Sequence, residues 1–136
     1  MNKSIKIALI LFLSILNINC SNSNQKNTQE NGRSITILSP IEFKEKSLNQ
    51  TIIDIRTPGE FRSGYIKGAK NINLFSKTFL DEIAKFDKNE SIYIYCRSGN
   101  RTSSASKKIS NLGFKQVYDL NGGIKNWTRA KNEIVK

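Results

Sequence analysis

Apolar and polar residues follow two different spacings along this chain, one typical of strands and one typical of helices. The β-branched and aromatic run Ser91–Tyr95 predicts a buried strand, whereas the run after Thr102 places Ala105, Ile109 and Leu112 on one helical face. By the same criteria we predict strands at residues 34–38, 51–55, 91–95 and 116–120, and helices at residues 76–85 and 124–130 and from about Pro40, Pro58 and Thr102. Strands and helices that alternate in this way indicate an α/β fold with a mainly parallel central sheet and helices on both faces.

Two of the helix starts carry a complete capping signal. Ser39-Pro40-Ile41-Glu42 and Thr57-Pro58-Gly59-Glu60 each combine a hydroxyl residue, a proline at the first helical position and a glutamate three residues after the hydroxyl. The hydroxyl and the glutamate can each accept a backbone N–H that the first turn leaves unpaired. Each segment therefore predicts a helix directly after a strand.

The length of 136 residues suits one domain with terminal extensions. We expect the domain to cover residues 34–130 and a frayed C-terminal tail to cover residues 131–136. Residues 20–33 are rich in Asn, Ser, Gln and Thr and poor in apolar residues, so they predict a flexible polar tether.

Residues 1–19 have the features of a signal peptide, since Lys3 and Lys6 precede an apolar run at residues 7–16 that is too short to span a bilayer. Cys20 follows that run, and this arrangement resembles a bacterial lipoprotein signal, in which the cysteine is lipidated and becomes the mature N-terminus. The resemblance implies an exported protein whose lipid on Cys20 holds it to a bacterial membrane, facing the periplasm or the exterior. Cleavage after Ser23 would instead remove Cys20 and leave a soluble periplasmic or secreted protein.

The charge balance narrows the possible partners. Lysine and arginine number 22 against 11 acidic residues, which gives a formal net charge of +11, but the lysines are scattered and no nucleic-acid-binding motif accompanies them. We therefore expect a solvated basic surface and no nucleic-acid partner. The chain contains no histidine, which excludes a Ser-His-Asp triad, a Cys-His pair and any His-bearing zinc site. We expect neither a metal nor a cofactor.

The strongest chemical signal is Cys96, which follows a predicted strand at the sheet edge where open α/β proteins bind their ligands. Backbone amides of a tight turn, the N-terminus of the next helix and nearby arginines all favour a thiolate. Cys96 is therefore the predicted nucleophile. The predicted anion-binding loop around it consists of Arg97, Ser98, Gly99, Asn100, Arg101 and Thr102.

The spacing of this loop separates two chemistries. Cysteine-dependent phosphatases and the related arsenate reductases need the pattern Cys-x5-Arg, a loop of seven residues that wraps a tetrahedral phosphate. Here Thr102 stands where that arginine would be, and Arg101 comes one residue early. The loop is too short for phosphate but suits a single sulfur atom bonded to Cys96.

Four segments together resemble the rhodanese-like single-domain sulfurtransferases. Besides the Cys96 loop, they are Thr51-Ile52-Ile53-Asp54-Ile55-Arg56-Thr57-Pro58-Gly59-Glu60-Phe61, then Gly64-Tyr65-Ile66-Lys67-Gly68-Ala69-Lys70-Asn71-Ile72, and finally Asp119-Leu120-Asn121-Gly122-Gly123-Ile124-Lys125-Asn126-Trp127. Tyr65 replaces the usual histidine of the second segment. The segments occur in the order of the family and extend from about Ile35 to Trp127.

This resemblance implies transfer of a sulfane sulfur from a small anionic donor such as thiosulfate to cyanide or a thiol, through a Cys96 persulfide. Arg97 and Arg101 would hold the donor, while the amides of residues 98–102 would stabilise the charge on sulfur. We expect a monomer in which Asp54 and Arg56 form a structural ion pair. A non-catalytic rhodanese-like module for binding or sulfur sensing is the alternative, although such modules usually lack the loop cysteine.

Overall fold

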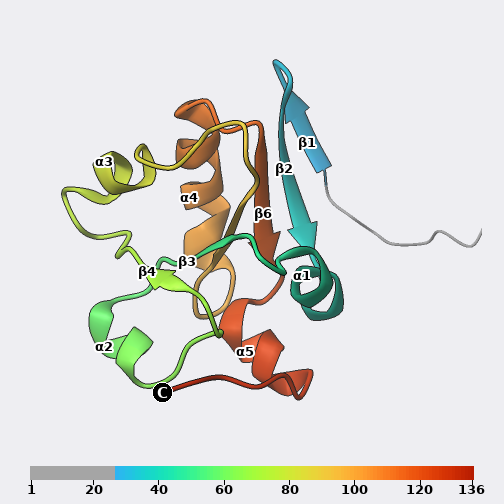
Figure 1. Ribbon diagram of the computed structural model, residues 1–136, viewed down its shortest axis with the longest axis vertical. Coiled ribbons are helices and arrows are strands. Elements are labelled where there is room, and N and C mark those ends of the chain that lie inside the picture. The colour runs from blue at the N-terminus through green and yellow to red at the C-terminus, as the bar shows by residue number, and fades with distance from the viewer. Residues whose placement is uncertain (1–26) are drawn as a thin grey trace, which may run out of the picture.

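Six strands form one sheet in the part of the chain that the computed structural model describes, residues 27–136 (Figure 1). The strands are β1 (Asn27–Glu30), β2 (Arg33–Leu38), β3 (Thr51–Asp54), β4 (Lys70–Asn71), β5 (Ile92–Tyr95) and β6 (Gln116–Leu120). Their order in the sheet is β1-β2-β6-β5-β3-β4, and all neighbouring pairs are parallel except the antiparallel β1–β2 hairpin. This confirms the predicted mainly parallel sheet.

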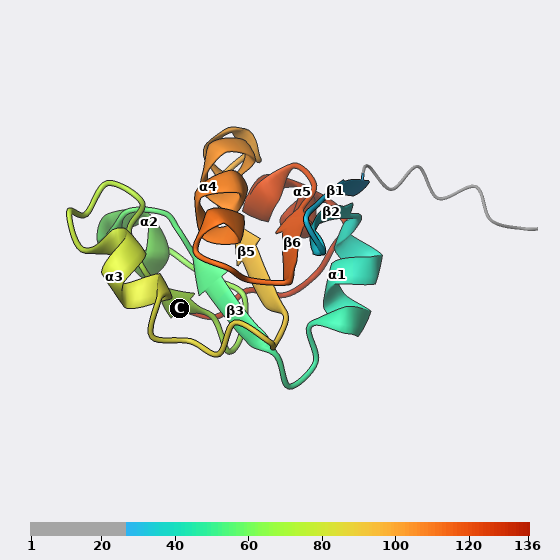
Figure 2. The ribbon, with the colours of Figure 1, turned by 90° about the horizontal axis from the view of Figure 1, so that it is seen from above.

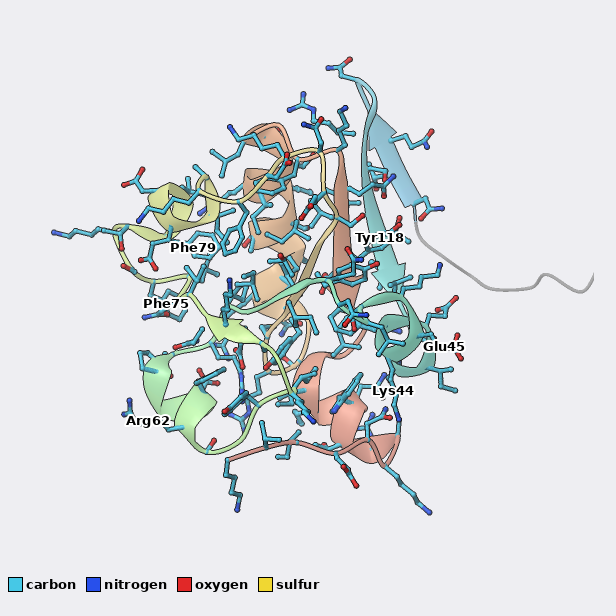
Figure 3. The ribbon with its side chains drawn as sticks, in the orientation of Figure 1. Lys44, Glu45, Arg62, Phe75, Phe79 and Tyr118 are labelled. Carbon is cyan, nitrogen blue, oxygen red and sulfur yellow. The ribbon has the colours of Figure 1, made fainter. Side chains whose placement is uncertain are left out.

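Helices cover both faces of the sheet, as predicted. They are α1 (Pro40–Lys46), α2 (Pro58–Arg62), α3 (Phe79–Ile83), α4 (Asn100–Asn111) and α5 (Gly123–Arg129). One core contains side chains of α3 and α4, among them Phe79, Ile83, Ala105 and Ile109, and the other contains Phe43 of α1 with Ile124 and Trp127 of α5. Figure 2 shows α1 and α4 on opposite sides of the central strands, and Figure 3 shows Phe79 pointing from α3 toward α4.

The central strand β5 divides its side chains between these two cores. Ile92, Ile94 and Cys96 belong to the core under α3 and α4, whereas Tyr93 and Tyr95 belong to the core under α1 and α5. This is the two-residue period of a strand with both faces covered. The strand pattern thus fixes the direction of Cys96, which points under the start of α4.

Both predicted capping boxes are present. The Ser39 hydroxyl accepts the Glu42 N–H, and the Glu42 carboxylate accepts the Ser39 N–H. Thr57 and Glu60 make the same reciprocal pair at the start of α2. The second box places Glu60 at the edge of the sheet where the parallel strands end.

Two terminal segments differ from the expectation of flexible ends. Part of the expected tether, Asn27–Glu30, pairs with β2 as strand β1. Asn31 and Gly32 both have positive φ, at 50° and 72°, which is the Asn-Gly hairpin geometry, and the free edge of β2 supplies the pairing partner.

The tail at residues 131–136 also packs against the domain rather than fraying. The Trp127 indole N–H donates to the Glu133 carbonyl at 2.8 Å, and Tyr65 and Val135 exchange two backbone hydrogen bonds of 2.9 Å. These hydrogen bonds satisfy polar groups beside the core that contains Trp127, where they would otherwise lack a partner.

Local boundaries differ from prediction in smaller ways. The helix predicted at residues 76–85 is only Phe79–Ile83, because Ser76 and Thr78 use their hydroxyls in a preceding turn. The helix after the Cys96 loop begins at Asn100, two residues before the predicted start. The short strand β4 was not predicted, since its two residues carry no periodic signal.

The expected signal peptide at residues 1–19 and the expected lipidation site, Cys20, lie outside the described residues. Within residues 27–136, no helix has both the length and the hydropathy needed to cross a membrane.

Candidate active site

Cys96 lies at the carboxyl end of β5, where the loop to α4 folds back over its sulfur. The thiol is buried, and the Gly99 backbone N–H points at Sγ with a nitrogen–sulfur distance of 3.1 Å. The Thr102 hydroxyl oxygen lies 3.9 Å from the same sulfur and donates to the Gly99 carbonyl at 2.9 Å. The Gly99 amide therefore donates to Sγ, an arrangement that stabilises a negative charge on sulfur.

The N-terminus of α5 donates main-chain hydrogen bonds to the Cys96 loop. The Ile124 N–H donates to the Cys96 carbonyl at 2.9 Å, and the Lys125 N–H donates to the Arg97 carbonyl at 3.1 Å. Gly123 makes this approach possible, because a Cβ at this position would overlap the backbone of Cys96 and Arg97 and its φ is +60°. The Gly-Gly pair at the start of α5 thus supports the Cys96 loop through main-chain contacts.

Arg101 is bound to a carboxylate in the first turn of α2. Its two terminal nitrogens donate to the two oxygens of Glu60 at 2.8 and 2.7 Å, a bidentate pair. The hydrogen bond from Arg101 lowers the pKa of Glu60 to about 2 despite partial burial, and the same bond raises the pKa of Arg101. Cys96 makes a smaller contribution to the raised pKa of Arg101.

A second arginine–carboxylate pair lies deeper, at the end of β3. Arg56 Nη2 lies 2.6 Å from Asp54 Oδ2 and 2.7 Å from the Gly64 carbonyl, and both charged side chains are nearly inaccessible. Burial lowers the pKa of Arg56, but the hydrogen bond and charge of Asp54 outweigh it and raise the value. This geometry agrees with the predicted structural ion pair.

The predicted site residues fall into two groups. Cys96 and Thr102 are buried and Gly99 and Arg101 are half-buried, so these four form the inner part of the cradle. Arg97, Ser98 and Asn100 are exposed at its outer edge. The structure brings all seven residues into one loop and helix start, as the spacing predicts.

A cleft of about 300 Å³ opens beside the loop. Its lining includes the cationic side chains Arg56, Arg97 and Lys125 and the carboxylate of Glu60. Arg97 and Lys125 are exposed, and the described residues give neither an ion-pair partner. They can therefore bind a small anion that approaches the loop from this side.

Three residues of the site were not identified as functional from the sequence. Glu60 was recognised only as a helix-capping residue, and Gly123 only as part of a family segment. The strand pattern gives Asp119 no special role, yet the side chain is buried on β6 opposite Ile94, two residues before Cys96. The spacing of the capping box could have revealed Glu60, because it places a carboxylate at the same sheet edge as Cys96.

The comparisons with known proteins agree with this geometry. A model of the Rhodanese-like domain matches residues 39–130. The uncharacterised protein YqhL of Bacillus subtilis is 33% identical over 95 residues, which cover 70% of this chain and 74% of that protein. The thiosulfate sulfurtransferase GlpE of Stutzerimonas stutzeri is 32% identical over 82 residues, covering 60% and 73% of the two chains.

Among solved structures, a rhodanese-related protein from Thermoplasma volcanium superposes with a TM-score of 0.65. It is 24% identical, with 72% of this chain and 95% of that chain covered, so it supports the fold alone. A rhodanese-like domain protein from Staphylococcus aureus has a TM-score of 0.59 and is 32% identical, with coverage of 67% and 89%.

Proposed function

Because this chain belongs to the rhodanese-like domain family, we propose that it is a sulfurtransferase in which Cys96 carries a sulfane sulfur as a persulfide. One observation carries the proposal: a buried cysteine sulfur receives a backbone N–H at 3.1 Å in a short loop that α5 holds in place. Preorganised donors of this kind stabilise a sulfur anion without reorganisation during the reaction. A sulfurtransferase needs that stabilisation twice, for the thiolate and for the persulfide.

The proposed reaction is a double displacement. The Cys96 thiolate attacks the outer sulfur of thiosulfate, a sulfur–sulfur bond forms, and sulfite leaves with the electron pair of the bond that breaks. Cyanide or an acceptor thiolate then attacks the terminal sulfur of the persulfide and regenerates the Cys96 thiolate. The Gly99 amide remains within hydrogen-bonding distance of the sulfur that carries the charge in the resting enzyme.

The cations around the loop have different proposed roles. Arg97 and Lys125 line the cleft and are exposed, so they attract and orient the anionic donor. Arg101 is engaged by Glu60, so it positions the start of α4 and adds positive charge near sulfur. In this proposal Arg97 binds the donor directly. Arg101 assists donor binding with its positive charge and by positioning the start of α4.

Intact-mass spectrometry tests the proposal. Incubation with thiosulfate should add one sulfur, about 32 Da, to the protein, and cyanide or dithiothreitol should remove it. The Cys96→Ser variant is the matched control and should take up nothing. Folded wild-type protein that gains no sulfur from thiosulfate or from a persulfide donor would favour the non-catalytic binding module.

Loop length gives a second test of the same site. The enzyme should not hydrolyse aryl phosphates. The loop from Cys96 to Arg101 is one residue shorter than a Cys-x5-Arg loop, so it offers one backbone amide fewer and its arginine comes one position too early to surround a tetrahedral phosphate. Appreciable phosphatase turnover in the wild-type protein would contradict this assignment.

We further propose that the protein is exported and anchored to a bacterial membrane through lipid on Cys20. The support is the sequence alone, since the run at residues 7–16, apolar except for Ser14, is too short to span a bilayer and stable anchoring then requires lipid. In a bacterial host, the full-length protein should enter the membrane fraction and incorporate a fatty-acid probe, and Cys20→Ala should lose both properties. Recovery of a soluble protein that begins at Asn24 would favour ordinary secretion instead.

A further inference from the structure

Asp119 is a buried carboxylate that the proposed sulfur transfer does not use. It lies on β6 between Ile37 of β2 and Ile94 of β5. It follows Val117 of the core under α4 by one strand period, so its side chain is on the face of the sheet that α4 covers. The residue is 5% exposed, and its Oδ1 atom is buried without a hydrogen-bond partner among the described residues. Burial raises the pKa of Asp119 to about 7, because this position solvates a charged carboxylate poorly.

A polar cavity of about 480 Å³ opens beside this carboxyl group, where α4 packs against β6 and β2 (Figure 1). This volume lies within the range of small-molecule sites, about 300–1,000 Å³. Asp119 is part of the lining, and Ile35 and Ile37 of β2 form an apolar wall. The rest of the lining is polar and comes from β1 and α4, namely Thr28, Ser103, Ser106, Lys107, Ser110 and Asn111.

The two charged residues of the described lining have opposite signs and lie at different levels of the cavity. Asp119 is near the carboxyl end of β6, the edge of the sheet at which α4 begins. Lys107 is about two turns into α4, farther from that edge, and its side chain is exposed. Neither forms an ion pair within residues 27–136. The hydroxyl groups of Ser103 and Ser106, which can both donate and accept, also line the cavity.

We propose that this cavity binds a small zwitterion of the amino-acid class, with its ammonium group at Asp119 and its carboxylate at Lys107. The ammonium group donates to the Asp119 carboxylate and supplies the counter-charge that this buried group lacks. The Lys107 side chain donates to the ligand carboxylate. The carbon chain of the ligand packs on Ile35 and Ile37, and the serine hydroxyls of α4 supply further hydrogen bonds.

The charges of the cavity disfavour simpler ligands. An anion would bring a second negative charge to a buried carboxylate, and a cation without an acid group would leave Lys107 unpaired. The cavity and the cleft beside Cys96 share no lining residue among those described. The inference therefore goes beyond the proposed sulfur transfer and does not depend on it.

A titration with three probes of equal chain length tests the proposal: 4-aminobutyrate, butyrate and n-butylammonium. Two-dimensional NMR of the full chain follows the backbone amides of Ser106, Lys107 and Asp119. The amides should shift with 4-aminobutyrate, with a Kd of about 1 mM or tighter. Butyrate should bind at least about tenfold more weakly, because it lacks the partner of the buried carboxylate. Binding of n-butylammonium should be about two- to fivefold weaker, because Lys107 is exposed and its pairing contributes less.

Variants assign the two charges. Asp119→Asn keeps the size of the side chain but removes its charge, so it should weaken 4-aminobutyrate binding by at least about tenfold. Lys107→Gln should weaken it by about two- to fivefold. Lys108→Gln is the matched control, since Lys108 is exposed on α4 and is not part of the described lining, and it should bind like wild type.

Two outcomes in the wild-type chain would overturn the proposal. One is the absence of shifts at these amides with 4-aminobutyrate, and the other is equal affinity for all three probes, as expected of an unselective pocket. The comparison of probes needs no variant, so it decides the question even if Asp119→Asn is unstable. Unchanged affinity in a folded Asp119→Asn would also overturn it. Persulfide formation is measured separately on Cys96, so failure of the proposed function would leave this result intact.

Discussion

The two arginine–carboxylate pairs of this protein look alike in geometry but differ in what surrounds them. Asp54 and Arg56 are two residues apart, and their side chains are 0% and 5% exposed. Glu60 and Arg101 are 41 residues apart, and theirs are 28% and 21% exposed. The first pair is a buried brace within one loop, whereas the second is a partly solvated clamp that joins α2 to the start of α4.

For the proposed sulfurtransferase, this difference separates effects on stability from effects on the reaction. Breaking a buried pair leaves one charge without a partner in a medium that solvates it poorly, so the cost appears in folding. Breaking a partly exposed pair costs little folding free energy, because water replaces much of the interaction. Its loss instead lets the residue beside Cys96 move, so the cost appears in the reaction.

The largest expected effect comes from breaking the brace. Asp54→Asn should lower the free energy of unfolding by about 3–5 kcal/mol, since Arg56 would remain charged and buried. Denaturant titration measures the loss. The double variant Asp54→Leu with Arg56→Met is the control and should be more stable than Asp54→Asn, because it removes both charges. A single variant as stable as wild type would contradict the buried-brace interpretation.

The clamp should give the opposite signature. Arg101→Ala should weaken thiosulfate use by about 10–100-fold, the scale of one or two charge-assisted hydrogen bonds. The same change should cost only about 1 kcal/mol of folding free energy. Steady-state kinetics and denaturant titration of one preparation provide both numbers.

Arg101→Lys should recover only part of the activity, because lysine is a point charge and cannot bind Glu60 with two parallel bonds. Arg129→Ala, on the exposed last turn of α5, is a matched control that should leave kinetics unchanged. Wild-type kinetics in both Arg101 variants would mean that Arg97 and Lys125 hold the donor without help.

Much of the brace could be predicted from the sequence, and the clamp could not. Asp54 and Arg56 are near neighbours after a strand, so their pairing is a local property that the sequence exposes. The bond between Glu60 and Arg101 depends on how α2 and α4 pack, which no local pattern encodes. The same limit applies to Asp119, whose position opposite Ile94 follows from the pairing of β5 with β6 in the sheet.

The chain ends show a related limit. The strand and helix periods predicted the central elements because burial on a face imposes a period. Strand β1 is polar and lies at the edge of the sheet, so burial left no pattern there, and only the Asn31-Gly32 turn pointed to a hairpin. The tail is held by main-chain hydrogen bonds, which any sequence can make, and by the single apolar side chain of Ile134, which is too little to form a periodic pattern.

Acid pH should weaken the clamp selectively. The pKa of Glu60 is lowered to about 2, below its ordinary value of 4.5, so its pairing stabilises the fold above that ordinary value and the contribution is lost as pH falls toward 2. We expect the stability difference between wild type and Glu60→Gln, about 1 kcal/mol at pH 7 after allowance for solvent exposure, to shrink to nothing near pH 2.

Thermal melts of the two proteins at matched ionic strength provide this measurement. A difference that stays constant from pH 7 to pH 2 would contradict this interpretation, because the bonds from Arg101 and from Thr57 both favour the charged carboxylate.

The smallest expected effect comes from stiffening the helix that carries the clamp carboxylate. Gly59 is exposed in α2, and a methyl group there would meet nothing closer than an Arg62 side-chain nitrogen at 4.0 Å. Gly59→Ala should therefore raise the free energy of unfolding by about 0.5–1 kcal/mol, because alanine has fewer unfolded conformations to lose. The gain should be the same in the Arg101→Ala background, since it arises within α2. A gain that vanishes in that background would mean that α2 is ordered only while Arg101 holds Glu60, which would make the clamp a structural element as well as a catalytic one.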